Sequence, residues 1–238
     1  MYFINWQREV SIREVDGRKV VVKQNKRTKT VHEFLLAATY TMISILVAHP
    51  SAPPAVGGLI RRNEGFVMRR ALEEIGISTP KLLTISDTSI VEELVPNGDL
   101  YRALSSGKDP ALAFQAGYIT AKLHMAGYAF IDNKAQNYLV DNNNSVVRTD
   151  LGFIQKTRSV FPRSMDVGSF LASAIDLQQY AKIERAFFDG YRETTQEDFP
   201  YLSIILRNML AIGFSSDHAQ AIRNMALKSA PLSRCSRI

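Results

Sequence analysis

The stretch that most constrains the fold of this chain is residues 123–152, where four polar side chains are spaced around a short hairpin. Asp132 is followed by Lys134 and Asn137, and Asp150 opens the triplet Asp-Leu-Gly beyond the hairpin. Phosphoryl transfer from ATP requires a carboxylate that orients the attacking hydroxyl, Mg²⁺ on the phosphate oxygens and fixed positive charge. The pattern predicts Asp132 as the hydroxyl-orienting base and Lys134 as the cation on the γ-phosphate. Because Mg²⁺ takes hard oxygen ligands, Asn137 and Asp150 are the predicted metal ligands.

A hairpin is predicted between the two groups of polar side chains. Residues 138–140 and 146–149 have strand-forming side chains, and the intervening Asp-Asn-Asn-Asn-Ser is a turn signal. A rigid hairpin would fix the separation of Asn137 and Asp150. The two predicted metal ligands would then converge without ordering of a loop, which is the preorganisation that such catalysis needs.

The same residues carry a family resemblance. Residues 123–139 read Leu-His-x-x-Gly-x-x-x-x-Asp-x-Lys-x-x-Asn-x-Leu, which resembles the catalytic loop of protein kinases. The triplet that begins at Asp150 resembles the Asp-Phe-Gly metal motif of that family. The resemblance implies ATP and Mg²⁺ as cofactors. Phe130 and Ile131 stand where the family has His-Arg or His-Gly, so loop-locking hydrogen bonds from those side chains are lost.

The resemblance also implies a fold. It predicts an α+β, bilobal protein-kinase-like architecture with a small antiparallel β-sheet lobe and a mostly helical lobe. The first lobe would span residues 1–95, with a helical insertion at about 30–58, and the second would span residues 96–238. Asp166 resembles the aspartate that holds the catalytic loop from below, and it also has the position of a helix N-cap. His124 is expected to be a packed, hydrogen-bonded core histidine.

The segment that follows the second predicted helix indicates which kinases the chain resembles most. Gly-Ile-Ser-Thr-Pro-Lys, residues 76–81, resembles the corresponding step in RIO kinases, in the small kinase of the tRNA threonylcarbamoylation complex and in lipopolysaccharide-core kinases. This implies a compact atypical kinase that phosphorylates a hydroxyl acceptor, with Ser/Thr of a protein as the expected one. A sugar or lipopolysaccharide-type acceptor and a catalytically impaired, nucleotide-binding scaffold are the alternatives.

Residues before the catalytic loop supply candidate nucleotide contacts. Residues 9–24 form a predicted hairpin around Asp-Gly, a type I′ turn signal. Lys23 ends its second strand and resembles the kinase lysine that pairs with the α- and β-phosphates. Residues 59–75 read as a helix capped by Gly76, and Glu64 lies on its inward face. A buried carboxylate needs a partner, so Glu64 is predicted to pair with Lys23, with Glu73 and Glu74 as alternatives nearer the end of the helix.

Two predicted strands, residues 81–86 and 88–95, lead into a hinge-like sequence. Adenine is expected to contact backbone groups of Glu93 and Val95. Asp99 stands where the family often has an acidic ribose contact, and an N-cap of the next helix is an equal alternative. No glycine occurs before position 17, so the glycine-rich phosphate loop of ordinary kinases is missing.

Residues 34–48 contain no charged side chain but are shorter than the ~20 residues that cross a bilayer. A buried or interface helix is expected there, with peripheral membrane contact as the alternative.

The net charge of +6 suits polyanionic partners. The last residues of the sequence are basic and include Arg223, Lys228, Arg234 and Arg237. The simpler interpretation is a solvated tail, and the alternative is a contact with nucleic acid or with an anionic surface. One cysteine and no visible signal peptide predict a cytoplasmic protein.

Overall fold

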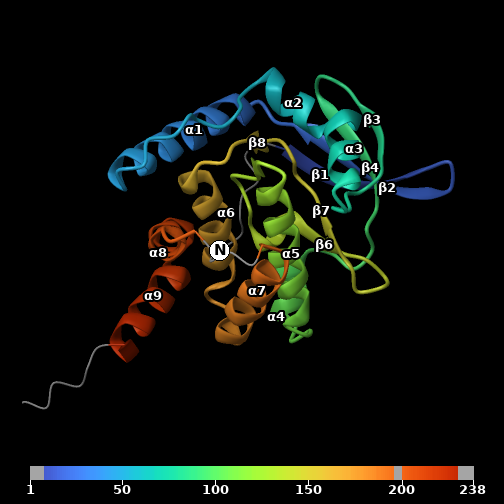
Figure 1. Ribbon diagram of the computed structural model, residues 1–238. Helices are drawn as coiled ribbons and strands as arrows, with labels where there is room; N and C mark the ends of the chain where they lie inside the picture. The colour runs from blue at the N-terminus through green and yellow to red at the C-terminus, as the bar shows by residue number, and fades with distance from the viewer. Residues whose placement is uncertain (1–7, 196–199, 230–238) are drawn as a thin grey trace, which may run out of the picture.

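The protein is described by a computed structural model over residues 8–195 and 200–229. It is a mixed α+β structure with a small antiparallel sheet, which confirms the coarse fold class predicted from sequence. The sheet has the order β1-β2-β4-β3. Its strands are β1 (Arg8–Val15), β2 (Arg18–Asn25), β3 (Leu82–Ile85) and β4 (Ser89–Glu93). Figure 1 shows this sheet with α2 and α3 on one side of it, and with most of the remaining helices below.

The β1–β2 hairpin forms as predicted because its turn residues accept positive φ angles. Asp16 has φ 50° and Gly17 has φ 71°, the backbone signature of a type I′ turn. Strand β2 then pairs with β4 so that Val21 lies opposite Glu92. Since side chains alternate between faces, Lys23 and Glu92 lie diagonally on one face of the sheet. The strand register thus places these two opposite charges together.

Two helices occupy the region where one was predicted. α2 (Gly58–Glu64) and α3 (Phe66–Glu74) are separated at Gly65, whose φ of −78° and ψ of 174° are extended. The break changes the helical phase, so that Val67, three residues after the buried Glu64, is 81% exposed. Arg69 and Leu72 are buried instead. Gly76 has φ 73° and ends the second helix as expected.

The helical part of the chain surrounds the main hydrophobic core. It contains α4 (Leu100–Ser105), α5 (Ala111–Met125), α6 (Val160–Ala174), α7 (Tyr180–Thr195), α8 (Ser203–Phe214) and α9 (Ser216–Ser229). Short strands connect them: β5 (Tyr128–Ala129) pairs with β8 (Gln155–Lys156), and β6 (Tyr138–Val140) with β7 (Val146–Arg148). The β6–β7 pair is the predicted hairpin, and the 3₁₀ turn η1 (Ala135–Asn137) leads into it.

Close packing of α5 on α7 depends on two glycines. A Cβ atom on Gly117 would lie 2.0 Å from the Phe187 carbonyl oxygen, and one on Gly190 would lie 1.9 Å from the Phe114 carbonyl oxygen. Because backbone atoms cannot move aside independently, we expect Gly117→Ala to reduce the free energy of unfolding by about 1–3 kcal/mol. Urea denaturation measures this change. Gly213→Ala is the matched control, since its Cβ would meet no atom within 4 Å. An equal effect at both glycines would contradict the packing argument.

Helix α1 (Lys29–Leu46) is only partly buried, so the buried alternative for this helix is wrong and the interface alternative stays a prediction. It buries only Glu33, Tyr40, Ile43 and Ser44, while Phe34 is 69% exposed. Figure 1 shows it as a long helix that extends beside the sheet and above the ends of α6 and α8. Across residues 8–195 and 200–229, no helix combines the length and the apolar character needed to cross a bilayer. Of the predicted basic end, Arg223 is exposed on α9 and Lys228 belongs to the same helix, whereas Arg234 and Arg237 lie outside the described residues.

Candidate active site

One buried arginine brings three predicted site residues together. Arg148, at the end of β7, is fully buried. Its Nη1 donates to the carbonyl oxygen of Asn137 at 2.8 Å, and its Nη2 donates to the carbonyl oxygens of Asp132 at 3.0 Å and Asp150 at 3.3 Å. The backbone N–H of Thr149 also donates to the Asn137 carbonyl at 3.0 Å. These bonds fix the backbone of both metal-ligand candidates and of the candidate base relative to one another.

Two aromatic rings pack against the Arg148 guanidinium. Its central carbon lies 4.2 Å from the centroid of the Phe130 ring and 5.0 Å from that of Tyr138. Such cation–π contacts are favourable where water is excluded. Phe130 therefore contributes a packing surface for the cation. The sequence analysis identified the loss of the histidine but did not identify Arg148 as the group that ties the loop.

Asp166 supplies the second tie to the catalytic loop. Its carboxylate accepts hydrogen bonds from the backbone N–H groups of Phe130 at 2.7 Å and Ile131 at 2.6 Å. Asp166 lies in the middle of α6, which begins at Val160, so the N-cap alternative is wrong and the loop-holding position is confirmed. His124 is buried between Asp166 and Tyr191, at 3.0 and 2.8 Å. Burial lowers the pKa of His124, which makes it the expected neutral core histidine.

The candidate base is held in a small polar group. Lys134 Nζ lies 2.7 Å from Asp132 Oδ1. The Asn137 amide nitrogen donates to the Asp132 carbonyl oxygen at 2.7 Å and to Asp132 Oδ2 at 3.3 Å. Since the nitrogen makes these bonds, the amide oxygen of Asn137 remains the group suited to a metal ion. The side chains of Asp132 and Lys134 are 17% and 27% exposed, so both are accessible to a substrate.

Two backbone conformations in this site are unusual. Ile131 has φ 68° and Asp150 has φ 58°, in the left-handed region that non-glycine residues rarely adopt. Positive φ is especially uncommon for a β-branched side chain such as Ile131. Strained backbone persists where surrounding contacts over-determine it, and it clusters at functional sites. Here the ties from Asp166 and Arg148 provide those contacts.

The predicted Lys23–Glu64 ion pair is wrong. Lys23 Nζ pairs with Glu92 Oε2 at 2.7 Å and donates to Thr149 Oγ1 at 2.7 Å. Glu64 is fully buried as expected, but its partners are Arg8 at 2.9 Å and Arg69 at 3.4 Å. The physical reason is the strand register, which already places Glu92 beside Lys23. The break at Gly65 then lets Arg69 lie against the end of α2.

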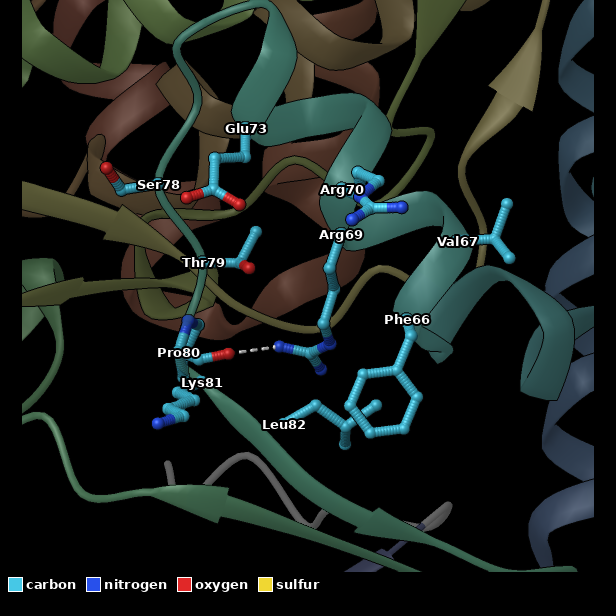
Figure 2. A pocket seen from close by; sticks show the side chains of 10 residues that line it. All are labelled: Phe66, Val67, Arg69, Arg70, Glu73, Ser78, Thr79, Pro80, Lys81 and Leu82. Carbon is cyan, nitrogen blue, oxygen red and sulfur yellow. Dashed lines mark hydrogen bonds between the residues drawn. The ribbon is translucent and has the colours of Figure 1, made fainter.

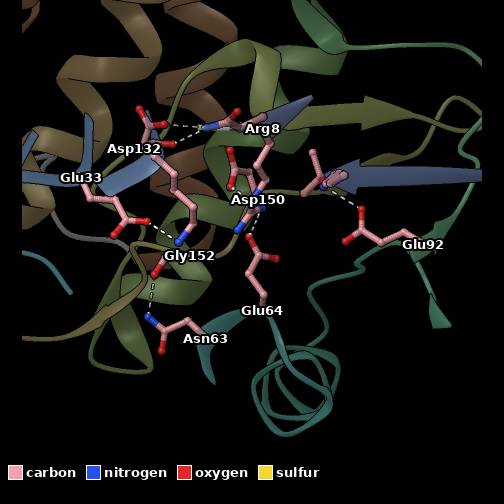
Figure 3. A network of polar contacts seen from close by, with 12 residues as sticks. Arg8, Glu33, Asn63, Glu64, Glu92, Asp132, Asp150 and Gly152 are labelled. Atoms are coloured by element: carbon pink, nitrogen blue, oxygen red, sulfur yellow. Dashed lines mark hydrogen bonds and ion pairs between the residues drawn. The ribbon is translucent and has the colours of Figure 1, made fainter. Parts of the chain in front are cut away.

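These side chains form a continuous row of alternating charge, part of which Figure 3 shows. Arg8 contacts Glu64, Glu64 contacts Arg69, Arg69 contacts Glu92, and Glu92 contacts Lys23, in that order. Arg8 Nη1 also lies 3.6 Å from Asp150 Oδ1, which joins the row to the predicted metal ligand. Neither Arg8 nor Glu92 was predicted as a site residue. Strand pairing of β2 with β4 was the signal that could have identified Glu92.

The row of charges stabilises two carboxylates in their ionised form. Burial would raise the pKa of Asp150, but the charges of Arg8, Lys23 and Arg148 outweigh it and lower this pKa. Burial likewise opposes ionisation of Glu92, and Lys23 and Arg69 reverse the effect, so that the Glu92 pKa is also lowered. Both groups are therefore anionic at neutral pH.

We expect acid to weaken the fold through these two carboxylates. A folded-state pKa below the unfolded value stabilises the protein above the unfolded pKa, and this contribution is lost as pH falls through the folded pKa. The unfolded values are 4.5 for Glu92 and 3.8 for Asp150. Urea denaturation at pH 7, 5, 4 and 3 should show the free energy of unfolding falling below about pH 4.5. Glu92→Gln should lower stability at pH 7 and weaken this acid dependence; an unchanged dependence would contradict the pairing.

The remaining predicted contacts lie between Glu93 and Asp99. The backbone N–H of Glu93 donates to the Lys81 carbonyl at 2.9 Å, so an adenine contact at Glu93 would use another backbone group. Val95 follows the end of β4 and is half-buried. Asp99 Oδ1 accepts the backbone N–H of Arg102 at 2.9 Å, which is the N-cap alternative. Its predicted ribose contact stays a prediction.

The segment after Asp150 is fixed by α2. The Asn63 amide donates to the carbonyl oxygens of Gly152 and Ile154, both at 2.8 Å. A Cβ atom on Gly152 would lie 2.7 Å from Ile60 Cγ2, so glycine permits this close approach. Figure 3 shows Asn63 beside Gly152, near Glu64 and Asp150. α2 therefore positions both its own glutamate and the Asp-Leu-Gly segment.

Two cavities differ in their relation to these residues. The larger, about 850 Å³, lies between α3 and residues 78–82, and Figure 2 shows its lining with Arg69 bonded to the Pro80 carbonyl at 2.6 Å. None of the predicted site residues lines it. A smaller cavity of about 260 Å³ includes Asp132 and Lys134 in its lining. The smaller cavity is therefore the one adjacent to the candidate chemistry.

The predicted metal site depends on few protein ligands. In the part of the chain that the structure describes, no group of three or more His, Cys, Asp or Glu is arranged to hold a metal ion. Asn137 and Asp150 offer one amide oxygen and one carboxylate, which fits a Mg²⁺ ion that shares phosphate and water oxygens. In comparisons with known protein families and with curated proteins, nothing matched this chain.

Proposed function

We propose that this chain is an ATP-dependent phosphotransferase of the atypical kinase type, with a bilobal kinase-like arrangement of residues 1–95 and 96–238. The observation that carries the proposal is the set of three bonds from Arg148 to the carbonyls of Asp132, Asn137 and Asp150. Preorganisation of a base and of metal ligands is the main requirement of phosphoryl transfer. A buried arginine bound to the backbone carbonyls of all three residues supports such preorganisation.

Each of the predicted site residues has a role in the proposed reaction. The oxygen of the acceptor hydroxyl bonds to the γ-phosphorus as the bond from that phosphorus to ADP breaks. Asp132 accepts the proton of this hydroxyl. Lys134, 2.7 Å from Asp132, holds the carboxylate and places positive charge beside the transferring group. Asn137 and Asp150 would hold Mg²⁺, which supplies charge neutralisation on the phosphate oxygens when bound. Lys23, buried between Glu92 and Thr149, contributes positive charge to the α- and β-phosphates of the nucleotide.

The test is transfer or release of the γ-phosphoryl from labelled ATP by the purified chain with Mg²⁺. Activity that depends on Asp132 supports the proposal, whichever hydroxyl serves as acceptor. Identical rates for the unaltered chain and for Asp132→Ala would contradict it. A Ser/Thr acceptor on a protein stays a prediction of the family resemblance.

A nucleotide-binding scaffold without turnover is the second candidate. The observation that favours it is Arg8, whose Nη1 lies 3.6 Å from Asp150 Oδ1, so a cation of the chain already lies beside the predicted metal ligand. A rise in melting temperature with Mg-ATP, together with no transfer of label, would favour this candidate.

A further inference from the structure

The cavity beside Asp132 bears on the identity of the acceptor. It has a volume of about 260 Å³ and is lined by α1, the catalytic loop, α6 and α8. Asp132 and Lys134 form its charged end. A molecule bound in this cavity therefore lies next to the carboxylate that takes the hydroxyl proton in the proposed reaction.

Most of the cavity wall is apolar, and several of its side chains pack in the hydrophobic core. The apolar lining comes from three helices and one loop residue: Leu35, Leu36 and Ile43 of α1, Met165 of α6, Leu210 and Phe214 of α8, and Ile131. Five of these, at positions 36, 43, 131, 165 and 210, belong to the hydrophobic cluster between α1, α6 and α8. Leu35 is 50% exposed, so the cavity is accessible from the outer side of α1.

Little charge enters the cavity apart from the Asp132–Lys134 pair. His32 of α1 also lines it, and burial, together with the nearby charge of Lys134, lowers the pKa of His32. Tyr40 donates its hydroxyl to Ser51 Oγ at 3.1 Å, and burial raises the pKa of Tyr40 to about 12. Both groups are uncharged at neutral pH. The cavity thus combines one charged end with walls that are mostly apolar and are interrupted by the hydroxyl groups of Thr39 and Ser169.

This combination discriminates between acceptor classes. Each residue of a bound peptide brings an N–H and a C=O that need hydrogen-bond partners, and apolar walls leave them unsatisfied. A hydroxyl-bearing head on a hydrocarbon body needs polar partners at one end only. We propose that the acceptor is an amphiphile whose hydroxyl reaches Asp132 while its apolar body lies against α1, α6 and α8. This inference rests on the proposed phosphotransferase function and assigns the acceptor class of the same site.

The reaction balances without a further reactant. The hydroxyl oxygen of the amphiphile bonds to the γ-phosphorus as the bond between that phosphorus and the bridging oxygen of ADP breaks. The hydroxyl proton passes to Asp132, and the products are ADP and a phosphate monoester of the amphiphile. The apolar walls stabilise the same hydrocarbon body before and after transfer.

Two glucosides with the same head test the inference. Octyl β-D-glucoside carries a hydrocarbon chain, and methyl β-D-glucoside carries the same hydroxyls without it. With labelled ATP and Mg²⁺, below the micelle concentration, we expect kcat/KM for the octyl compound to exceed that for the methyl compound roughly 100-fold. Equal values, or faster transfer to a serine-containing peptide than to octyl glucoside, would overturn the inference.

Matched variants of α1 locate the binding. Leu35→Gln places an amide in the cavity wall at a half-exposed position, so the fold is retained. We expect it to raise KM for octyl glucoside about tenfold and to leave methyl glucoside unchanged. Leu46→Gln is the control, because Leu46 is on the same helix, is 67% exposed and does not line the cavity. An equal rise in both variants would assign binding to the general apolar surface and not to the cavity.

Failure of this inference is distinguishable from failure of the proposed function. Turnover of ATP without acceptor and the melting-temperature shift with Mg-ATP report the nucleotide site alone. Saturation-transfer NMR with octyl glucoside reports the cavity without nucleotide. If ATP is turned over but octyl glucoside neither binds nor reacts, the amphiphile proposal fails and the phosphotransferase proposal stands. Leu35-dependent binding of octyl glucoside without any ATP turnover would contradict the phosphotransferase proposal, and the cavity would then be an amphiphile-binding site without an acceptor role.

Discussion

Asp132→Asn is expected to lower the rate of phosphoryl transfer by about 10²–10⁴-fold, the usual contribution of a positioned general base. Asparagine keeps the size of the side chain but cannot accept the hydroxyl proton. It also removes the negative partner of Lys134, at 2.7 Å in the unaltered chain. The change leaves Lys23, Asn137 and Asp150 in place, so the affinity for Mg-ATP should change little.

Single-turnover transfer from labelled ATP measures the rate, and the melting-temperature shift with Mg-ATP measures binding. Asp189→Asn is the matched control, because Asp189 is exposed on α7 and no predicted site residue lies on that helix. Loss of binding in Asp132→Asn would indicate a structural role for the carboxylate. Equal transfer by Asp132→Asn and the unaltered chain would contradict the assignment of the base.

Arg148→Met is expected to reduce the free energy of unfolding by about 3–5 kcal/mol. Methionine is flexible and fills much of the space of arginine between Phe130 and Tyr138, but it donates no hydrogen bond. The carbonyl oxygens of Asp132, Asn137 and Asp150 would each lose a charged donor. Since a domain has only about 5–15 kcal/mol of net stability, this loss is large.

Urea denaturation at pH 7 measures the effect, with Arg185→Met as control. Arg185 is exposed on α7, and surface substitutions of this kind usually change stability by less than about 0.5 kcal/mol. Arg148→Lys should be intermediate, because a lysine carries the charge but not the planar fork of donors. If Arg148→Met retained full stability and full phosphoryl transfer, the central role of this arginine would be refuted.

Several features of the fold could be predicted because they depend on neighbouring residues. Asp16 and Gly17 accept the positive φ angles of a tight turn, so the β1–β2 hairpin was predictable from two residues. The β6–β7 hairpin, the helix that ends before Gly127 and the α4 helix after Asp99 follow from the same local chemistry. The grouping of Asp132 with Asn137 also follows, since five residues of chain join them.

Partner choice among buried charges could not be predicted in this way. Glu64 was identified as a buried carboxylate that needs a cation, and this was correct. Its cation is Arg8 and not Lys23, because the register of β2 on β4 places Glu92 beside Lys23 and the end of β1 places Arg8 beside Glu64. Register is a property of paired strands, and one strand alone does not contain it.

The sequence by itself determined the α+β class, the two hairpins and the residue types of the candidate chemistry, since each depends on contacts within a few residues. Only the tertiary structure decided that Arg148 ties Asp132, Asn137 and Asp150, and that α1 closes an apolar cavity beside Asp132. Hydrogen bonds and cavity walls between distant segments depend on how the elements pack. That packing is fixed by the burial of whole helix and sheet faces, which no local pattern specifies.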